Sequence, residues 1–129
     1  MPNLNNHDLA YPYKDGRTYT GYMLSEASRL GITSPAAEFA VNSTLTLGNV
    51  TRTGFVLAYG QIKRLAENFD SVTALYLALG KDKAPFDLRS GLWWSSCQGN
   101  ATGAVGLYGG GFTSSLKTGS RSVLVGFDL

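Results

Sequence analysis

The sequence holds few of the residues from which a reactive site is built. Its 129 residues include one cysteine, Cys97, and one histidine, His7. A single cysteine cannot form an internal disulfide, so the fold does not depend on oxidation. A thiol nucleophile needs a nearby base, and His7 lies in the N-terminal segment, so we interpret Cys97 as a small packed apolar residue. No convergent set of His, Cys, Asp and Glu is visible, and we expect no enzymatic activity and no cofactor.

Charged residues are also scarce, at 16% of the chain against the usual quarter. The formal net charge is +2, and both signs are spread along the sequence. The densest basic pair, Lys63-Arg64, falls in a helical pattern and is expected on a solvated face. These features give no electrostatic footprint for nucleic acid, and none is expected as a partner.

Long hydrophobic runs are missing as well. The longest, such as residues 74–79, fall far short of the roughly 18 to 20 residues that cross a bilayer. The N-terminus lacks the basic flank and the apolar stretch of a signal peptide. We therefore expect no membrane insertion, and a chain that either folds in the cytoplasm or has had an export signal removed.

The most informative part of the chain is its last forty residues. Residues 91–129 contain nine glycines and nine Ser or Thr, but only three charged residues. Such a mixture of turn formers and strand formers is typical of a compact β-meander. The glycines at 109–111 predict a hairpin turn, because glycine adopts a positive φ without strain. A segment of this kind indicates a binding or assembly module.

Apolar periodicity places helices before strands. We expect helices over 19–30 and 35–41, a strand-loop mixture over 42–53, a buried strand over 54–57, and a helix with Ile62, Leu65 and Ala66 on its buried face. A further helix should begin at Asp70 and end at Gly80, with a buried stripe formed by Val72, Leu75, Tyr76 and Leu79. Strands are expected over 92–96, 104–108, 112–116 and 123–127. This order predicts the α+β class, in a single domain over 17–129.

Residues 1–16 read as a polar, turn-like N-terminal arm. Ordering such a segment costs on the order of 1 kcal/mol or more per residue in backbone entropy. Either its own domain or a neighbouring chain must supply that free energy. We expect the arm to dock on a protein neighbour, in an oligomer or a larger complex.

The motifs of the second half resemble those of a known family. These motifs are Gly54-Phe-Val-Leu-Ala-Tyr-Gly-Gln-Ile62, two helices that end at Leu77-Ala-Leu-Gly80, then Trp93-Trp-Ser-Ser96 and Val123-Leu-Val-Gly-Phe127. Their order and spacing resemble a C-type-lectin-like domain of the kind found in gut-bacterial surface proteins, which is related to formylglycine-generating enzyme and to the variable proteins of diversity-generating retroelements. The resemblance covers about residues 15–129, without the family's closing arginines. It implies short helices packed on a small twisted antiparallel sheet.

The resemblance also suggests which residues bind. It implies that Trp94 is the core tryptophan, so that Trp93, its neighbour along a strand, faces outward and contacts a partner. Recognition in lectin-like folds commonly uses the surface of this half, which adds four further contact candidates to Trp93. They are Gln98, Asn100, Tyr108 and Phe112.

Neither the chemistry of the related enzymes nor that of calcium-dependent lectins is expected. Formylglycine-generating enzymes use paired cysteines, and this chain has one. The E-P-N, Q-P-D and W-N-D motifs of sugar-binding lectins are absent. Asp70, Asp82 and Asp87 lie in one region, but their spacing matches no calcium loop. We therefore expect no metal site.

The sequence is compatible with three functions. The preferred hypothesis is a non-enzymatic binding or structural module, an accessory protein for decoration or adhesion in a bacteriophage particle, assembled in the host cytoplasm and docked on a neighbouring protein or glycan. The alternative is a secreted or lipoprotein adhesin domain at the cell surface that binds glycan or protein. A small enzyme is the least favoured, for want of a reactive cluster.

Overall fold

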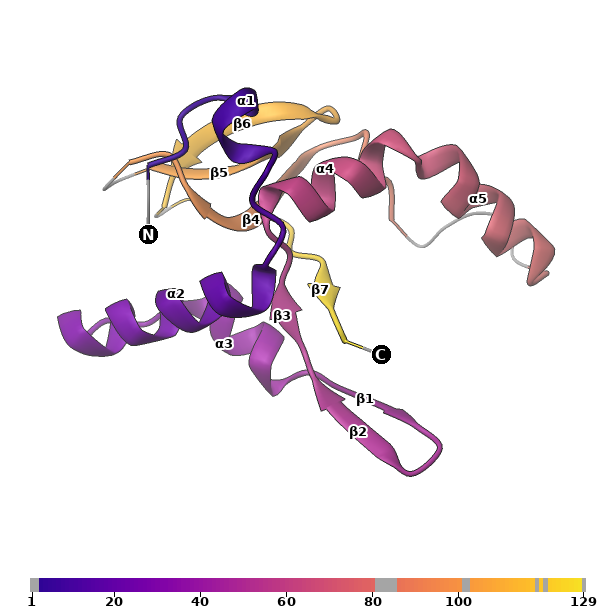
Figure 1. The fold of residues 1–129 in the computed structure, drawn as a ribbon, viewed down its shortest axis with the longest axis horizontal. Helices are drawn as coiled ribbons and strands as arrows, with labels where there is room; N and C mark the ends of the chain where they lie inside the picture. Colours follow the sequence, from indigo (N-terminus) through magenta and orange to yellow (C-terminus); the bar gives the residue numbers. More distant parts are fainter. Residues whose placement is uncertain (1–2, 81–85, 101–102, 118, 120, 129) are drawn as a thin grey trace.

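A computed structural model describes residues 3–80, 86–100, 103–117, 119 and 121–128 (Figure 1). The helices are α1 His7–Ala10, α2 Gly16–Leu30, α3 Pro35–Asn42, α4 Tyr59–Glu67 and α5 Phe69–Ala78. The strands are β1 Thr44–Leu47, β2 Val50–Thr53, β3 Phe55–Val56, β4 Leu92–Gln98, β5 Gly103–Tyr108, β6 Gly111–Leu116 and β7 Val125–Gly126. Short helices and small antiparallel sheets alternate, and the expected α+β class is confirmed.

Within the described residues the strands form three small antiparallel sheets. The largest is the β4-β5-β6 meander that the glycine-rich segment predicted, and its β5–β6 turn places both Gly109 and Gly110 at positive φ, 57° and 83°. A two-residue hairpin turn of this kind needs positive φ at both positions. The strand expected over 123–127 is reduced to β7, which pairs with β3 rather than with the meander. β1 and β2 form a separate hairpin.

The main core lies where α4 crosses the meander. Tyr59 and Ile62 of α4 are fully buried against Val105 and Leu107 of β5, and Leu88 completes the cluster. Arg64 and Glu67 face solvent, as the periodicity of this helix predicted. Lys63, which was expected on the same face, is half-buried and donates to the Gly110 carbonyl oxygen at 2.7 Å. Leu88 lies between α5 and β4, and its complete burial was not predicted.

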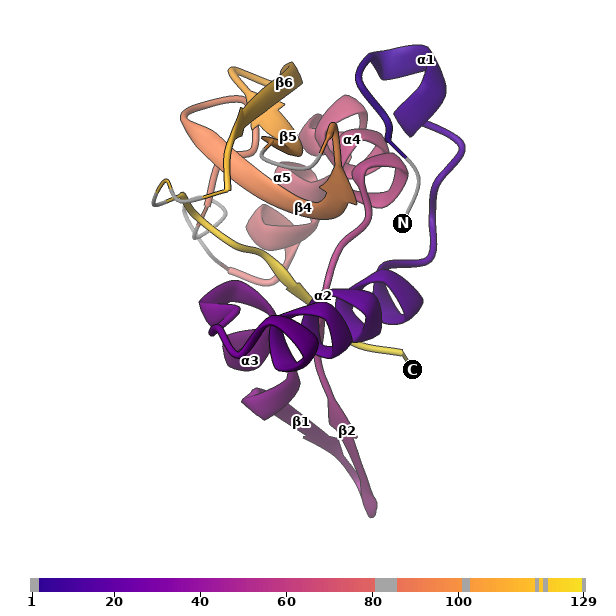
Figure 2. The same ribbon diagram turned by 90° about the vertical axis from the view of Figure 1, so that its left-hand side faces the viewer.

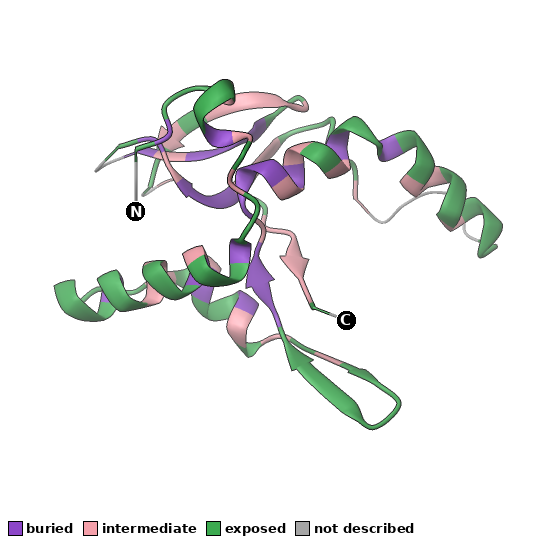
Figure 3. Cartoon of the chain, viewed as in Figure 1, coloured by how far each residue is buried: buried purple, intermediate pink, exposed green. Residues whose placement is uncertain are grey.

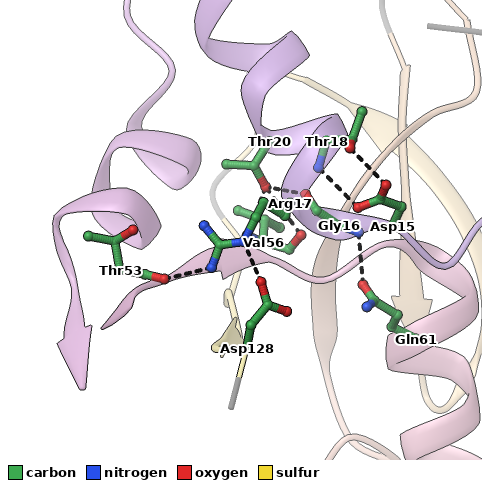
Figure 4. A network of polar contacts seen from close by, with 9 residues as sticks. All are labelled: Asp15, Gly16, Arg17, Thr18, Thr20, Thr53, Val56, Gln61 and Asp128. Atoms are coloured by element: carbon green, nitrogen blue, oxygen red, sulfur yellow. Dashed lines mark hydrogen bonds and ion pairs between the residues drawn. The ribbon is translucent and has the colours of Figure 1, made fainter. Parts of the chain in front are cut away.

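Residues at the start of α2 form hydrogen bonds with β2, β3, α4 and the segment after β7 (Figure 4). The carboxylate of Asp15 caps the helix by accepting from the Thr18 backbone N–H at 3.2 Å. Gly16 donates to Gln61 Oε1 of α4 at 3.0 Å. A Cβ at Gly16 would overlap the carbonyl oxygen of Val56, so only glycine lets α2 approach β3 this closely. The helix therefore starts three residues earlier than the apolar pattern predicted, and it ends as expected at Gly31, which has φ 67°.

The N-terminal arm is held by its own domain. We call residues 3–14 the strap. Leu4 is buried and donates its backbone N–H to the Gln98 carbonyl oxygen at 2.8 Å, and Gly60 donates to the carbonyl oxygen of Tyr13 at 2.9 Å. The strap also contains α1, which the sequence did not predict, capped by the side chain of Asn6. Figure 2 shows the strap passing from the end of β4 down to α2.

The prediction of a buried stripe on the helix that follows Asp70 is wrong for two of its four residues, Leu75 and Leu79. Val72 and Tyr76 are half-buried against the core, but Leu75 and Leu79 are exposed. The reason is tertiary, because α5 runs outward from α4 and only its first turns reach the core (Figure 1). Figure 3 shows green, exposed surface on α5, on the β1–β2 hairpin and on the outer half of α2, all of which project from the buried centre.

Candidate functional site

The five contact candidates lie at two ends of the meander. β4 pairs with β5 so that Leu92 lies opposite Tyr108 and Gln98 lies opposite Ala104. Trp93, Tyr108 and Phe112 are therefore near one end of β4, and Gln98 and Asn100 are at the other. At about 3.3 Å per residue, the two ends are roughly 20 Å apart. The structure does not bring the five residues together into one site.

Most of these candidates have structural contacts. The Phe112 ring meets the buried Tyr59 ring edge-on at 5.4 Å between centroids. Gln98 donates to the Asn3 side chain at 3.2 Å and accepts from Lys117 at 2.9 Å, while Asn100 Oδ1 accepts from the Gly103 backbone at 2.7 Å. Tyr108 is exposed at the β5–β6 turn. Tyr108, 65% exposed, presents an open aromatic surface to a ligand.

The expected roles of the two tryptophans are not observed. Trp93 packs against the core cluster, and its indole N–H donates to the Ser90 carbonyl oxygen at 2.9 Å. Trp94 is half-buried on the opposite face of β4, with the Arg121 guanidinium 5.9 Å from its ring centroid. Adjacent strand residues point to opposite faces, and α4 covers the face that carries Trp93. The expectation that Trp94 is the core residue is therefore wrong.

His7 and Cys97 both contact Tyr59, at its opposite ends. His7 Nδ1 lies 2.7 Å from the phenolic oxygen, whereas Cys97 Sγ accepts from the Tyr59 backbone N–H at 3.4 Å. The side chain of Tyr59 thus separates the imidazole from the thiol. Burial raises the pKa of the Cys97 thiol, which disfavours the thiolate that a nucleophile needs. The arrangement holds the core together and offers no activated sulfur.

The aspartates after α4 form ion pairs on the surface. Asp70 and Asp87 both contact the Arg89 guanidinium, at 2.9 and 3.4 Å, and Asp82 lies outside the described residues. Within the described part of the chain, no group of three or more His, Cys, Asp or Glu is placed to hold a metal ion. None of the helices in this part of the chain has the length and apolar character needed to span a membrane.

The β1–β2 hairpin is an amphipathic ribbon that projects from the molecule. Its register places Leu45 opposite Arg52 and Leu47 opposite Val50. Residues opposite one another share a face of the sheet, as do residues two apart along a strand, so these four side chains form one face. The other face carries threonines 44, 46, 51 and 53. Leu47 and Val50, at the tip, are 57% and 48% exposed.

The apolar face of this ribbon borders a hollow of about 220 Å³, which we call the hairpin groove. It is lined by Leu45, Leu47, Val50, Arg52 and Asp128. Arg17 fixes one wall, because its guanidinium binds the Asp128 carboxylate at 2.6 Å and the Thr53 carbonyl oxygen at 2.9 Å (Figure 4). Arg52 has no hydrogen bond or ion pair with any described residue. The groove is thus apolar, with one unpaired cation at its rim.

The outer part of α5 is a second unpartnered apolar surface. Leu75, Leu77 and Leu79 are 59%, 55% and 67% exposed, and residues 71–80 include no charged side chain. A helix without a polar face is normally buried in a larger core. Full burial of one leucine contributes about 1.5–3 kcal/mol, so covering these three would contribute on the order of 3–5 kcal/mol. Leu75 and Leu79, one turn apart, form one exposed apolar strip, and Leu77 lies on another side of the helix. Exposed apolar surface of this kind marks interaction sites.

Sequence reasoning missed both surfaces. The apolar run at 74–79 was visible, but amphipathic periodicity assigned it to the core of its own domain. No protein-family model, curated protein or solved structure matches the chain. The function of the two surfaces is therefore inferred from their own chemistry.

Proposed function

We propose that the chain is a non-enzymatic structural module that docks on neighbouring proteins of an assembly, as an accessory protein of a bacteriophage particle. The observation that carries the proposal is the exposure of Leu75, Leu77 and Leu79 on a projecting helix segment without charge. Interfaces of permanent assemblies are apolar and depleted of charge at their centre. This segment of α5 has both properties.

The second projecting element supports the same function. A two-stranded ribbon is at best marginally stable in water unless one face is covered, yet the apolar face of the β1–β2 hairpin packs on little of its own domain. Leu47 and Val50 flank the turn at Gly48, where the hairpin extends furthest (Figure 2). Contact with a neighbouring subunit would remove both side chains from water and stabilise the hairpin.

The scaffold we propose is C-type-lectin-like. The strand at 55–56, the helix pair, the tryptophan-bearing β4 and the closing β7 follow one another in the order that the resemblance implies. β7 returns to pair with β3, so that segments about seventy residues apart lie side by side. Fold alone does not assign function, and the docking role rests on the exposed apolar residues.

The alternative is an adhesin domain at the cell surface that binds glycan or protein. The observation in its favour is the exposed ring of Tyr108, next to the two glycines of the β5–β6 turn. An exposed aromatic ring offers a flat apolar face for a sugar. This surface is a single residue, whereas the α5 and hairpin surfaces are built from several, so the assembly function is preferred.

The test measures whether the chain is incorporated into phage particles. Particles made by the phage or prophage that carries the gene are separated on a density gradient and probed with an antibody against the chain. We expect the chain to co-migrate with capsid or tail protein. We also expect a Leu75→Asp/Leu79→Asp variant to leave that peak while Ser71→Asp, an exposed change in the first turn of α5, stays in it. Recovery in the cell envelope, or equal incorporation of all forms, contradicts the proposal.

A further inference from the structure

We infer that the outer edge of β6 pairs with β6 of a second copy of this chain, antiparallel about a twofold axis, so that the two meanders join into one continuous sheet. This interface is separate from α5 and from the β1–β2 hairpin, and the inference goes beyond the proposed docking function. It rests on the contrast between the two edges of the meander, β4 and β6.

The β4 edge is closed by other parts of the same chain. On the side of β4 that faces away from β5, the backbone is hydrogen-bonded to the backbone of three separate segments, at residues 4, 57 and 122. These segments bond to Gln98, Ser96 and Trp94, at 2.8, 2.9 and 2.9 Å. An edge covered in this way offers no unpaired backbone to another strand.

The β6 edge is open. The β5–β6 turn has two residues, so Tyr108 and Gly111 form a hydrogen-bonded pair, and bonded and outward-facing residues then alternate along β6. Phe112 and Ser114 therefore direct their backbone N–H and C=O groups away from β5. Within the described residues these groups have no hydrogen-bond partner, and no strand pairs with β6 on this side. Figure 2 shows β6 as the outermost strand of the meander.

β6 lacks the features that normally protect an edge strand, which are charge, proline, a bulge or a covering element. Its sequence, Gly111-Phe-Thr-Ser-Ser-Leu116, has no charged residue and no proline, and its pairing with β5 is regular. Residues 90–116 contain no charged side chain at all. The chemistry that fits a row of open backbone donors and acceptors on such a strand is the backbone of another extended strand.

The side chains of β6 fit a second copy of the same strand. A twofold axis at Ser114 places this residue opposite its own copy, and it places Phe112 opposite Leu116 of the other chain. All three residues carry outward backbone groups, so each donor meets an acceptor. Leu116 is 67% exposed and lies on the same face of β6 as Phe112, so the pairing covers it with an aromatic ring. A twofold contact of this kind closes as a dimer.

The charges around this edge do not oppose the pairing. Lys117 and Arg121, which follow β6, both reach back to side chains of β4 in their own chain, away from the edge. At the other end of β6, the cations are Lys63, which donates to the Gly110 carbonyl oxygen at 2.7 Å, and Arg89, whose side chain packs beside this glycine. Arg89 is paired with two aspartates, so these four side chains together carry no net charge.

Sedimentation velocity and amide hydrogen exchange test the inference on the full chain. At about 100 µM the wild-type chain should form a dimer that dissociates on dilution. In the dimer, exchange at Phe112 and Ser114, quenched and read by NMR, should be at least about 10-fold slower than in the dilute monomer, because their N–H groups become bonded. The amides of Thr113 and Ser115, which face β5 in both states, are the internal control and should change little.

Ser114→Lys and Ser114→Glu test the twofold register. Each variant alone places like charges directly opposite one another and should associate at least about 10-fold more weakly than the wild-type chain. An equimolar mixture should recover a heterodimer, because lysine then faces glutamate. The matched controls are Thr46→Lys and Thr46→Glu on the exposed β1–β2 hairpin, which should dimerise like the wild-type chain, alone or mixed. Circular dichroism verifies that all four variants fold.

Three results would overturn the inference. The first is a wild-type chain that stays monomeric at the concentration given above, whether or not it enters particles, so the docking function is judged separately. The second is a dimer in which Phe112 and Ser114 exchange as fast as in the monomer, because the copies then meet through another surface, such as α5. The third is protection of these amides without recovery in the Lys–Glu mixture, because Ser114 then does not face its own copy.

Discussion

His7 Nδ1 lies 2.7 Å from the phenolic oxygen of Tyr59, so the strap is bonded to the largest fully buried side chain of the core. Tyr59 also donates its backbone N–H to Cys97 Sγ of β4, at 3.4 Å. The strap, α4 and β4 therefore meet at one residue.

The Tyr59 phenol should make the protein sensitive to alkaline pH. Burial, with smaller contributions from Glu67 and Tyr11, raises the pKa of Tyr59 from 10.0 to about 12. Between these values the unfolded chain has lost the proton that the folded chain keeps, so stability falls as the pH rises through this window. The loss approaches about 2–3 kcal/mol at its upper end. Urea unfolding measured below pH 10 and near pH 12 should show it.

Tyr59→Phe should abolish most of this loss between pH 10 and 12, because the titrating group is gone. At neutral pH the same variant should be less stable by about 1 kcal/mol, since His7 loses its hydrogen bond. Tyr108→Phe, which removes an exposed phenol, is the control and should keep the alkaline loss. An unchanged profile in Tyr59→Phe would assign the sensitivity to another group.

The Cys97 thiol should be unreactive in the folded protein. It is 2% exposed, and burial raises its pKa. A thiol reagent at about pH 8 should therefore modify it only after denaturant is added, at least about 100-fold faster than in the native chain, since modification requires opening of the core. Rapid labelling without denaturant would mean that β4 separates from α4 in solution.

Gly60→Ala should displace the strap. A Cβ at this position would overlap the carbonyl oxygens of Tyr11 and Tyr13, which are backbone atoms and cannot swing aside. We expect a loss of about 1–3 kcal/mol, as for overpacked cores, and faster tryptic cleavage at Lys14. Gly21→Ala is the matched control because a Cβ there meets nothing within 4 Å. That change should stabilise α2 by up to about 1 kcal/mol.

Asp15→Ala should destabilise α2 by about 0.5–2 kcal/mol, whereas Asp15→Asn, which can still accept from Thr18, should cost less. Hydrogen bonds from the hydroxyl and backbone of Thr18 lower the pKa of Asp15. The stabilisation is therefore present above the pKa of the unfolded carboxyl and is lost as the pH falls through the folded value. Thermal unfolding at neutral and acidic pH should show that Asp15→Ala removes this part of the acid dependence.

Leu75→Ala should barely change the stability of the isolated chain, by less than about 0.5 kcal/mol, because the side chain is 59% exposed. Ile62→Ala, one helix earlier and fully buried, should cost about 2–5 kcal/mol. Urea unfolding at low protein concentration compares the two. A large loss for Leu75→Ala in the monomer would mean that α5 folds back on its own domain.

Local rules predicted much of the fold. Gly31, Pro35 and the glycines at 109–110 stand at the ends of elements as the sequence predicted, and the alternation of Ile62 and Ala66 with Arg64 and Glu67 oriented α4 correctly. The capping role of Asp15 was not predicted. The candidate site was predicted less well. Trp93, Gln98 and Phe112 were expected to bind a partner, but they make contacts within the domain. Composition could not show this, because residue type does not specify which face of a strand is covered.

The sequence by itself determined the α+β class, most of the helices and the glycine-turned meander, because these depend on interactions between residues close in the chain. Only the tertiary structure decided which apolar faces are covered. The same periodicity that buries Ile62 leaves Leu75 and Leu79 in water, since α5 runs outward from α4. Likewise the strap is ordered by Gly60, Gln98 and Tyr59, which lie far from it along the chain. Burial is a property of packing between distant segments, and a periodic pattern shows that a face is apolar without showing what covers it.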